Sequence, residues 1–72
     1  MSDWVYVDSS NIEAICYFAN ASPRELQVRF LNGSTYSYSD VPEEIYEELL
    51  NAPSKGSYLN RMIKGVYNYQ KL

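Results

Sequence analysis

Tyrosines are the residues of this sequence whose type and spacing most clearly suggest chemistry, because eight of the 72 residues are tyrosine. Two of them, Tyr36 and Tyr38, are separated by a single serine. Side chains along a strand alternate between the two faces of a sheet, so both rings share one face. Rings on an open sheet face can stack on nucleic-acid bases, whereas buried rings supply much of the core of a small domain.

The length of the turn before these tyrosines decides between the two roles. The Asn-Gly pair at residues 32–33 is a strong hairpin signal, because both residue types tolerate positive φ. A loop of residues 32–33 places Arg29 opposite Tyr36, on a face that could stack bases. A loop of residues 31–33 places Val28 opposite Tyr36 and directs both rings into the core. A shift of one residue inverts the face, and the sequence leaves both registers open.

A second group of candidate residues forms the start and one stripe of a predicted helix. Ser54 can cap this helix, and free backbone N–H groups together with Lys55 could hold a phosphate. The alternative is a capped helix start in which Gly56 packs closely against a neighbouring segment. Arg61 and Lys64 share one stripe of the helix, which suits either a polyanion or solvent. The candidate RNA- or phosphate-binding set is Ser54, Lys55, Gly56, Arg61, Lys64, Tyr36, Tyr38, Tyr67 and Arg29.

Charge is distributed unevenly along the chain. Residues 1–50 carry all nine acidic side chains and two basic ones, whereas residues 51–72 carry four basic side chains and no acid. A solvated acidic face is the simplest interpretation of the carboxylates on the first predicted helix. The alternative is docking on a basic protein partner through that face. The residues concerned are Glu43, Glu44, Glu47 and Glu48.

Composition argues against several classes of chemistry. The chain has no histidine and one cysteine, Cys16, which lies in an apolar segment and is expected to be a buried thiol. It lacks a nucleophile–base pair and the ligands of a transition-metal site, so we expect no enzyme, no metal, no cofactor and no small-molecule substrate. The single thiol and the lack of a signal peptide or membrane-spanning run predict a cytoplasmic protein with no membrane partner.

The hydrophobic pattern predicts one α+β domain over residues 1–72. Apolar and β-branched runs predict strands at residues 4–7, 12–19, 26–30 and 35–39, joined as an antiparallel meander of three to four strands. Two short helices follow, at residues 42–51 and 54–65, and residues 66–69 could form a short C-terminal strand. Trp4 and Tyr6 on an edge strand could also allow self-association with a second copy.

Four stretches of the sequence occur in a characteristic order. They are Val7-x-Ser9-Ser10-x-Ile12, Leu26-x-Val28-x-Phe30-x-x-Gly33, Tyr36-x-Tyr38-x-x-Val41-Pro42 and Ser54-Lys55-Gly56-x-Tyr58-x-Asn60-x-x-Ile63-Lys64-Gly65-x-Tyr67. Together they resemble the KTSC domain, a family named after the C-terminal extension of some lysyl-tRNA synthetases. The family also occurs as small stand-alone bacterial and phage proteins.

This resemblance implies a small noncatalytic binding module with RNA as the candidate ligand. Binding would be weak, salt-sensitive and directed mainly at phosphates, through the basic helix face and exposed tyrosines. The alternative is a protein-interaction module, such as a phage accessory protein or inhibitor, that docks on a basic partner through its acidic helix.

Overall fold

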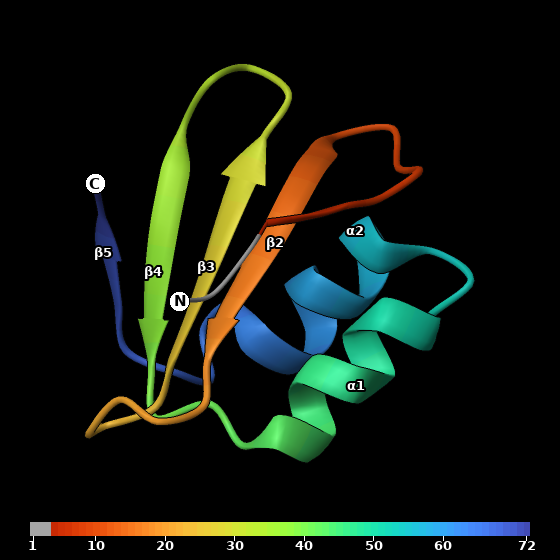
Figure 1. Cartoon of the computed structure of the whole chain (residues 1–72). Coiled ribbons are helices and arrows are strands. Elements are labelled where there is room, and N and C mark those ends of the chain that lie inside the picture. The colour runs from red at the N-terminus through yellow and green to blue at the C-terminus, as the bar shows by residue number, and fades with distance from the viewer. Residues whose placement is uncertain (1–3) are drawn as a thin grey trace.

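The computed structural model describes residues 4–72 and has an α+β fold. Five antiparallel strands form one sheet in the order β1-β2-β3-β4-β5, and the helical segments pack on one face of it (Figure 1). The predicted meander, the two short helices and the C-terminal strand are therefore confirmed. The elements are β1 (Val5–Tyr6), β2 (Ile12–Phe18), β3 (Glu25–Phe30), β4 (Thr35–Ser39), α1 (Glu43–Asn51), α2 (Lys55–Tyr58), the π-helical segment η1 (Leu59–Ile63) and β5 (Tyr69–Lys71).

The turn between β3 and β4 has three residues, so the second of the two possible registers holds. Phe30 donates its N–H to the carbonyl of Ser34 (2.8 Å), which leaves residues 31–33 as the loop. Gly33 lies at φ 94°, a conformation that glycine adopts at little cost. Val28 is therefore paired with Tyr36, so this tyrosine lies on the helix-facing side of the sheet.

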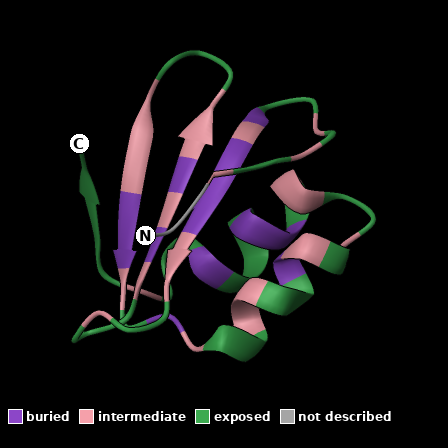
Figure 2. Cartoon of the chain, in the orientation of Figure 1, coloured by how far each residue is buried: buried purple, intermediate pink, exposed green. Residues whose placement is uncertain are grey.

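The core fills the space between the sheet and the helical segments. Buried side chains alternate along β3 and continue on α1 and η1, as Figure 2 shows in purple. Each buried leucine or isoleucine contributes about 1.5–3 kcal/mol relative to an exposed one, which matters in so small a domain. The core residues are Ile12, Ile15, Leu26, Val28, Tyr38, Val41, Leu49, Tyr58, Leu59 and Ile63.

The face of the sheet opposite the helices also carries buried residues. Ala14 is fully buried and Cys16 is 1% exposed, which confirms the buried thiol. Arg29 lies on this face, where its guanidinium is 4.3 Å from the centre of the Trp4 ring. The same guanidinium is 3.9 Å from a carboxylate oxygen of Glu13. This cation–π contact and ion pair hold Arg29 away from the helical side.

The chain returns to the sheet after η1 through a tight turn at Gly65, which lies at φ 83°. The backbone N–H groups of Val66 and Tyr67 both donate to the carbonyl of Ile63, at 3.0 and 3.1 Å. These donors are engaged in the turn and cannot join a sheet ladder. The predicted strand at residues 66–69 is therefore wrong in its position, and the last strand is Tyr69–Lys71.

The helices are tied to each other and to the sheet by tyrosine side chains. The ring of Tyr17 stacks on Tyr46 with their centres 4.7 Å apart, and its hydroxyl donates to the carbonyl of Val41 (2.6 Å). The Tyr58 hydroxyl donates to Glu48 (2.6 Å), which joins α2 to α1. Because these bonds join segments far apart in sequence, they help to fix the helices on the sheet.

The contact between Gly56 and Asn11 supplies a first test of the fold. A Cβ atom added at Gly56 would lie 2.6 Å from the side-chain oxygen of Asn11. Helix propensity alone predicts that Gly56→Ala stabilises the protein by up to about 1 kcal/mol. We expect the displacement of the exposed Asn11 side chain to offset part of this gain. Gly56→Ala should therefore raise the urea midpoint of unfolding less than helix propensity predicts. In an Asn11→Ala background the same change should raise the midpoint more, and an effect independent of Asn11 would contradict the packing.

Tyr58 supplies a second test, through the pH dependence of stability. Burial, and then the hydrogen bond to Glu48, raise the pKa of Tyr58 from 10.0 to about 12. The neutral phenol is therefore favoured in the folded state, so its contribution to stability is complete below pH 10 and is lost as pH rises through 12. The free energy of unfolding, measured with urea, should fall more steeply between pH 10 and pH 12 for the wild type than for Tyr58→Phe. If the free energy of unfolding of the two proteins depended on pH in the same way, the raised pKa of Tyr58 would be contradicted.

Candidate functional site

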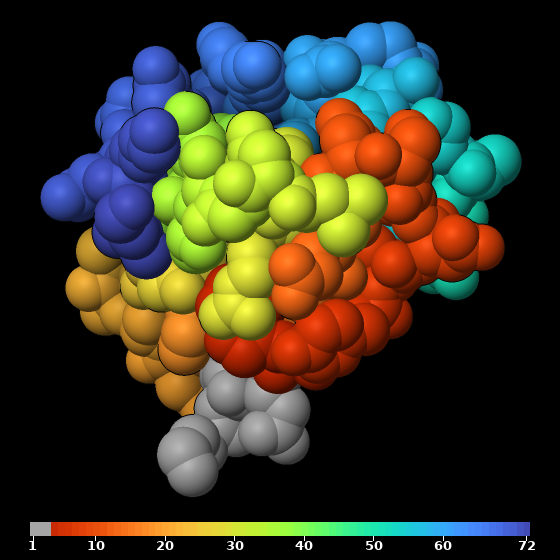
Figure 3. Space-filling model, turned by 90° about the horizontal axis from the view of Figure 1, so that it is seen from above, coloured from red at the N-terminus to blue at the C-terminus, as the bar shows by residue number. Residues whose placement is uncertain are grey.

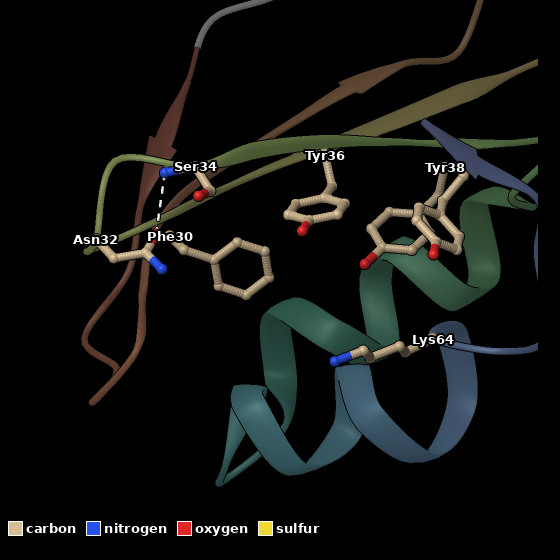
Figure 4. A pocket seen from close by; sticks show the side chains of 7 residues that line it. Phe30, Asn32, Ser34, Tyr36, Tyr38 and Lys64 are labelled. Atoms are coloured by element: carbon tan, nitrogen blue, oxygen red, sulfur yellow. Dashed lines mark hydrogen bonds between the residues drawn. The ribbon is translucent and has the colours of Figure 1, made fainter. Parts of the chain in front are cut away.

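A pocket lies between strands β3, β4 and β5 and the residue that follows η1 (Figure 4). Its volume is about 230 Å³, which suits a small chemical group better than a whole drug-sized ligand. Four of the seven lining residues are aromatic, one is a cation and none is a carboxylate. We call it the tyrosine pocket, and it is lined by Phe30, Asn32, Ser34, Tyr36, Tyr38, Lys64 and Tyr69.

The aromatic wall of the pocket follows from strand pairing. Tyr36 and Tyr38 alternate with a serine along β4, and Tyr69 on β5 is paired with Tyr38. The Phe30 ring meets Tyr36 edge-on, with the ring centres 5.7 Å apart. The Tyr69 ring lies 5.8 Å from Tyr36 and 6.1 Å from Tyr38. These spacings are typical of favourable aromatic pairs, so the rings form one connected surface.

Lys64 brings a positive charge to this wall from the helical layer. The backbone N–H of Lys64 donates to the carbonyl of Leu59 (2.8 Å). This bond closes the last turn of η1 and fixes the position of the Lys64 backbone. Figure 4 shows the Lys64 side chain extended along the helical layer, with the rings of the sheet facing it across the pocket. Viewed onto the β3–β4 loop, the light-blue helical segment and the dark-blue C-terminal strand lie on neighbouring sides of that loop (Figure 3). The cation and the rings thus come from parts of the chain that meet only after folding.

Polar groups at the pocket can still donate hydrogen bonds to a ligand. Burial, and then the neighbouring hydroxyls of Tyr36 and Tyr69, raise the pKa of Tyr38, so its protonated hydroxyl is favoured even more than in an ordinary tyrosine. Asn32 accepts the N–H of Ser34 through its side-chain oxygen (3.0 Å), and its amide nitrogen is left to donate elsewhere. The pocket therefore combines apolar ring faces with several donors.

The structure brings together three members of the predicted RNA- or phosphate-binding set, Tyr36, Tyr38 and Lys64. Tyr38 is only 2% exposed and Tyr36 is half-buried, so of the two alternatives left open by the sequence, the one that directs both rings toward the core holds. Arg29 does not join them, because the three-residue turn places it on the opposite face of the sheet beside Trp4.

The start of α2 does not form a free phosphate cradle. Ser54 accepts the N–H of Ser57 (3.4 Å) as a helix cap, and Lys55 donates to the carbonyl of Ala52 (3.2 Å). Gly56 packs against another segment, at Asn11. These contacts match the structural alternative considered for the sequence Ser54-Lys55-Gly56. They give each of the three residues a structural role.

The remaining predicted residues lie outside the tyrosine pocket. Arg61 is exposed on η1, and Tyr67 is half-buried against the core. The four glutamates of α1 are exposed, and Glu48 is engaged with Tyr58. In the described residues 4–72, no group of three or more His, Cys, Asp or Glu side chains is placed to hold a metal ion. Over the same range no helix combines the length and apolar character that crossing a membrane requires.

Four lining residues were not singled out from the sequence as parts of a site, namely Phe30, Asn32, Ser34 and Tyr69. Asn32 serves the turn through its bond with Ser34, and Phe30 packs partly buried against the core. Tyr69 is the important omission, because it is 61% exposed and contacts both strand tyrosines. Its alternation with Tyr67 hinted at a strand, but which strand it would pair with is not encoded locally.

Known proteins share both the sequence and the fold. The sequence profile of the KTSC domain matches residues 8–67. A lysine–tRNA ligase of Trichormus variabilis is 43% identical over 56 residues, which cover 78% of this chain and 10% of the ligase. A protein of Tsukamurella paurometabola is 41% identical over 58 residues, which cover 81% of this chain and 84% of that protein. The crystal structure of a KTSC domain protein from Yersinia pestis superposes with a TM-score of 0.87 at 33% identity, covering 100% of this chain and 99% of that one.

The domain thus occurs both as a small part of a ligase and as most of a short protein. The matched region spans only about a tenth of the length of the Trichormus variabilis ligase. The resemblance noted in the four sequence stretches is confirmed by the profile, the identities and the superposition. The chain belongs to the KTSC domain family.

Proposed function

We propose that this protein is a small noncatalytic module that binds RNA at the tyrosine pocket. The observation that carries the proposal is the meeting of aromatic rings and one lysine ammonium in a pocket that no carboxylate of the described residues lines. Stacking of bases on aromatic rings and charge attraction to phosphates are the two interactions on which single-stranded RNA binding generally depends.

Stacking is available at the open side of the pocket. Tyr69 is 61% exposed, and its ring extends the wall formed by Tyr36. Base–aromatic stacking contributes about 1–3 kcal/mol per base and tolerates any sequence. An unpaired base resting on Tyr69 is therefore the first contact that we assign.

Charge around the pocket favours the RNA backbone. Lys71 is paired with Tyr36 across β4 and β5 and so lies on the same face of the sheet as the pocket tyrosines. All nine acidic side chains precede residue 51, and four of them lie on α1. Their negative charge disfavours contact between RNA and the surface of α1. Few phosphate contacts imply weak binding, whose salt dependence has a slope of about −0.7 per phosphate on a logarithmic plot.

The occurrence of the domain in lysine–tRNA ligases supports RNA as the ligand class. The Trichormus variabilis relative is by name an enzyme that acts on tRNA, and this chain matches about a tenth of it. Its ligase activity is not carried over to so small a portion. What the comparison supports is a contact with RNA made by an appended domain.

The first test of the function compares two cations of the same helical segment. Lys64→Gln and Arg61→Gln remove the same charge, but only Lys64 lines the pocket. We expect Lys64→Gln to weaken binding of a short unstructured RNA about tenfold, because a charge-assisted hydrogen bond is lost. Arg61→Gln should have a smaller effect. Fluorescence anisotropy at low salt, repeated at high salt, measures both.

A second matched pair separates stacking from charge. Tyr69→Ala and Tyr6→Ala each remove a ring that is more than half exposed, on opposite faces of the sheet. Only Tyr69→Ala should reduce RNA affinity. Equal losses within either pair would rule out the pocket as the binding surface. Failure of the wild type to bind RNA at low salt would remove the proposed function and make docking through Glu43, Glu44, Glu47 and Glu48 the hypothesis to test.

A further inference from the structure

The tyrosine pocket directs hydrogen-bonding groups toward one small space. Figure 4 shows the hydroxyls of Tyr36 and Tyr38 and the ammonium of Lys64 pointing into the gap between the sheet and η1. Tyr69 lines the same space and contacts both other tyrosines. None of the hydrogen bonds or ion pairs formed among residues 4–72 uses these hydroxyls or this ammonium. They are therefore available to a ligand.

These groups are complementary to an oxyanion. The lysine donates only, and the phenols donate as long as they are protonated. A tyrosine is ordinarily protonated at neutral pH, and burial raises the pKa of Tyr38 further. Within residues 4–72, no carboxylate lines the pocket, although that range carries eight acidic side chains. Phosphate oxygens gain charge-assisted hydrogen bonds from such a set of donors.

The shape of the pocket distinguishes the end of an RNA strand from its interior. Tyr38 lines the pocket and is only 2% exposed, so its ring bounds the inner side of the pocket. An internal phosphodiester carries a sugar on each side and would have to lie across the mouth. A terminal phosphate monoester has one substituent, three free oxygens and a charge of about −1.5 to −2 at pH 7. It can enter a volume of about 230 Å³ with its sugar left outside.

We propose that the tyrosine pocket holds a terminal phosphate monoester at the end of an RNA strand, an assignment that rests on the proposed RNA-binding function. Lys64 neutralises part of its charge, and the hydroxyls of Tyr36, Tyr38 and Tyr69 donate to its oxygens. The neighbouring base then lies against the exposed ring of Tyr69. A free mononucleotide carries the same group, so the two sources of the monoester must be separated by experiment.

The test uses one short oligouridine in three forms, with a 5′-phosphate, a 3′-phosphate or hydroxyls at both ends. Uridine monophosphate and inorganic phosphate serve as free competitors. We expect a phosphate at one end to raise affinity about tenfold over the hydroxyl form, the gain typical of a charge-assisted hydrogen bond. Lys64→Gln should abolish this difference between the forms. Calorimetric titration of the full chain measures each affinity.

A matched pair of tyrosine variants assigns the effect to the pocket hydroxyls. Tyr36→Phe keeps the ring that contacts Phe30 and Tyr69 and removes only the hydroxyl. Tyr67→Phe removes a hydroxyl from a half-buried tyrosine outside the pocket. The ratio of the affinities for the phosphorylated and the hydroxyl-ended oligouridine should fall severalfold in Tyr36→Phe. The same ratio should be unchanged in Tyr67→Phe. Equal behaviour of the two variants would overturn the role assigned to the hydroxyls.

The remaining outcomes separate this inference from the proposed function. Equal affinity for all three oligouridines would overturn the terminal-phosphate assignment and leave RNA binding in place. Binding of uridine monophosphate without binding of any oligouridine would overturn RNA as the source and support the monoester pocket. Binding of none of the probes would overturn both.

Discussion

The register between β3 and β4 is the constraint on which the candidate site depends. Gly33 at φ 94° allows a three-residue turn, and the turn pairs Val28 with Tyr36. Because strand side chains alternate with period two, this choice sends Tyr36 and Tyr38 toward the helices and Arg29 to the other face. A turn shorter by one residue would exchange these sets. The aromatic wall and the absence of Arg29 from it are thus two results of one local geometry.

The pocket also requires the chain to return to the sheet after the helical layer. Gly65 turns the chain, and β5 then pairs with β4 so that Tyr69 lies opposite Tyr38. Without that pairing, Tyr36 and Tyr38 would border an open edge of the sheet. The same return leaves Lys64 at the end of η1, across from the rings. A site composed of hairpin, helix end and C-terminal strand can therefore form only when all three are folded together.

Ordinary structural contacts account for much of the polar surface that first attracted functional interpretation. Ser54 caps α2, Lys55 donates to the end of α1, and Gly56 makes room for Asn11. Glu48 likewise joins Tyr58. The three polar side chains provide hydrogen-bond partners that the folded chain would otherwise lack, and Gly56 avoids a steric clash. Lys64 differs from them, because no contact within residues 4–72 engages its ammonium.

Local patterns in the sequence were sufficient to predict the type of most elements. The alternation in residues 26–30, the Asn-Gly turn, and Pro42 before an acidic first turn predicted two strands, a hairpin and a helix, and all are observed. The motif order also identified the family. These signals succeed because strand and helix periodicity and turn chemistry act over a few neighbouring residues.

The site itself was decided by tertiary structure. Tyr36, Tyr38 and Lys64 could be named as candidates from the sequence, but their meeting with Tyr69 could not. The turn length at residues 31–33 selected one of two registers with similar local signals, and the β4–β5 pairing joined residues more than thirty positions apart. By itself the sequence determined the elements and the residue types available for binding. Which of those side chains face one another was decided only in the folded chain, because strand register and long-range pairing depend on the packing of the whole core.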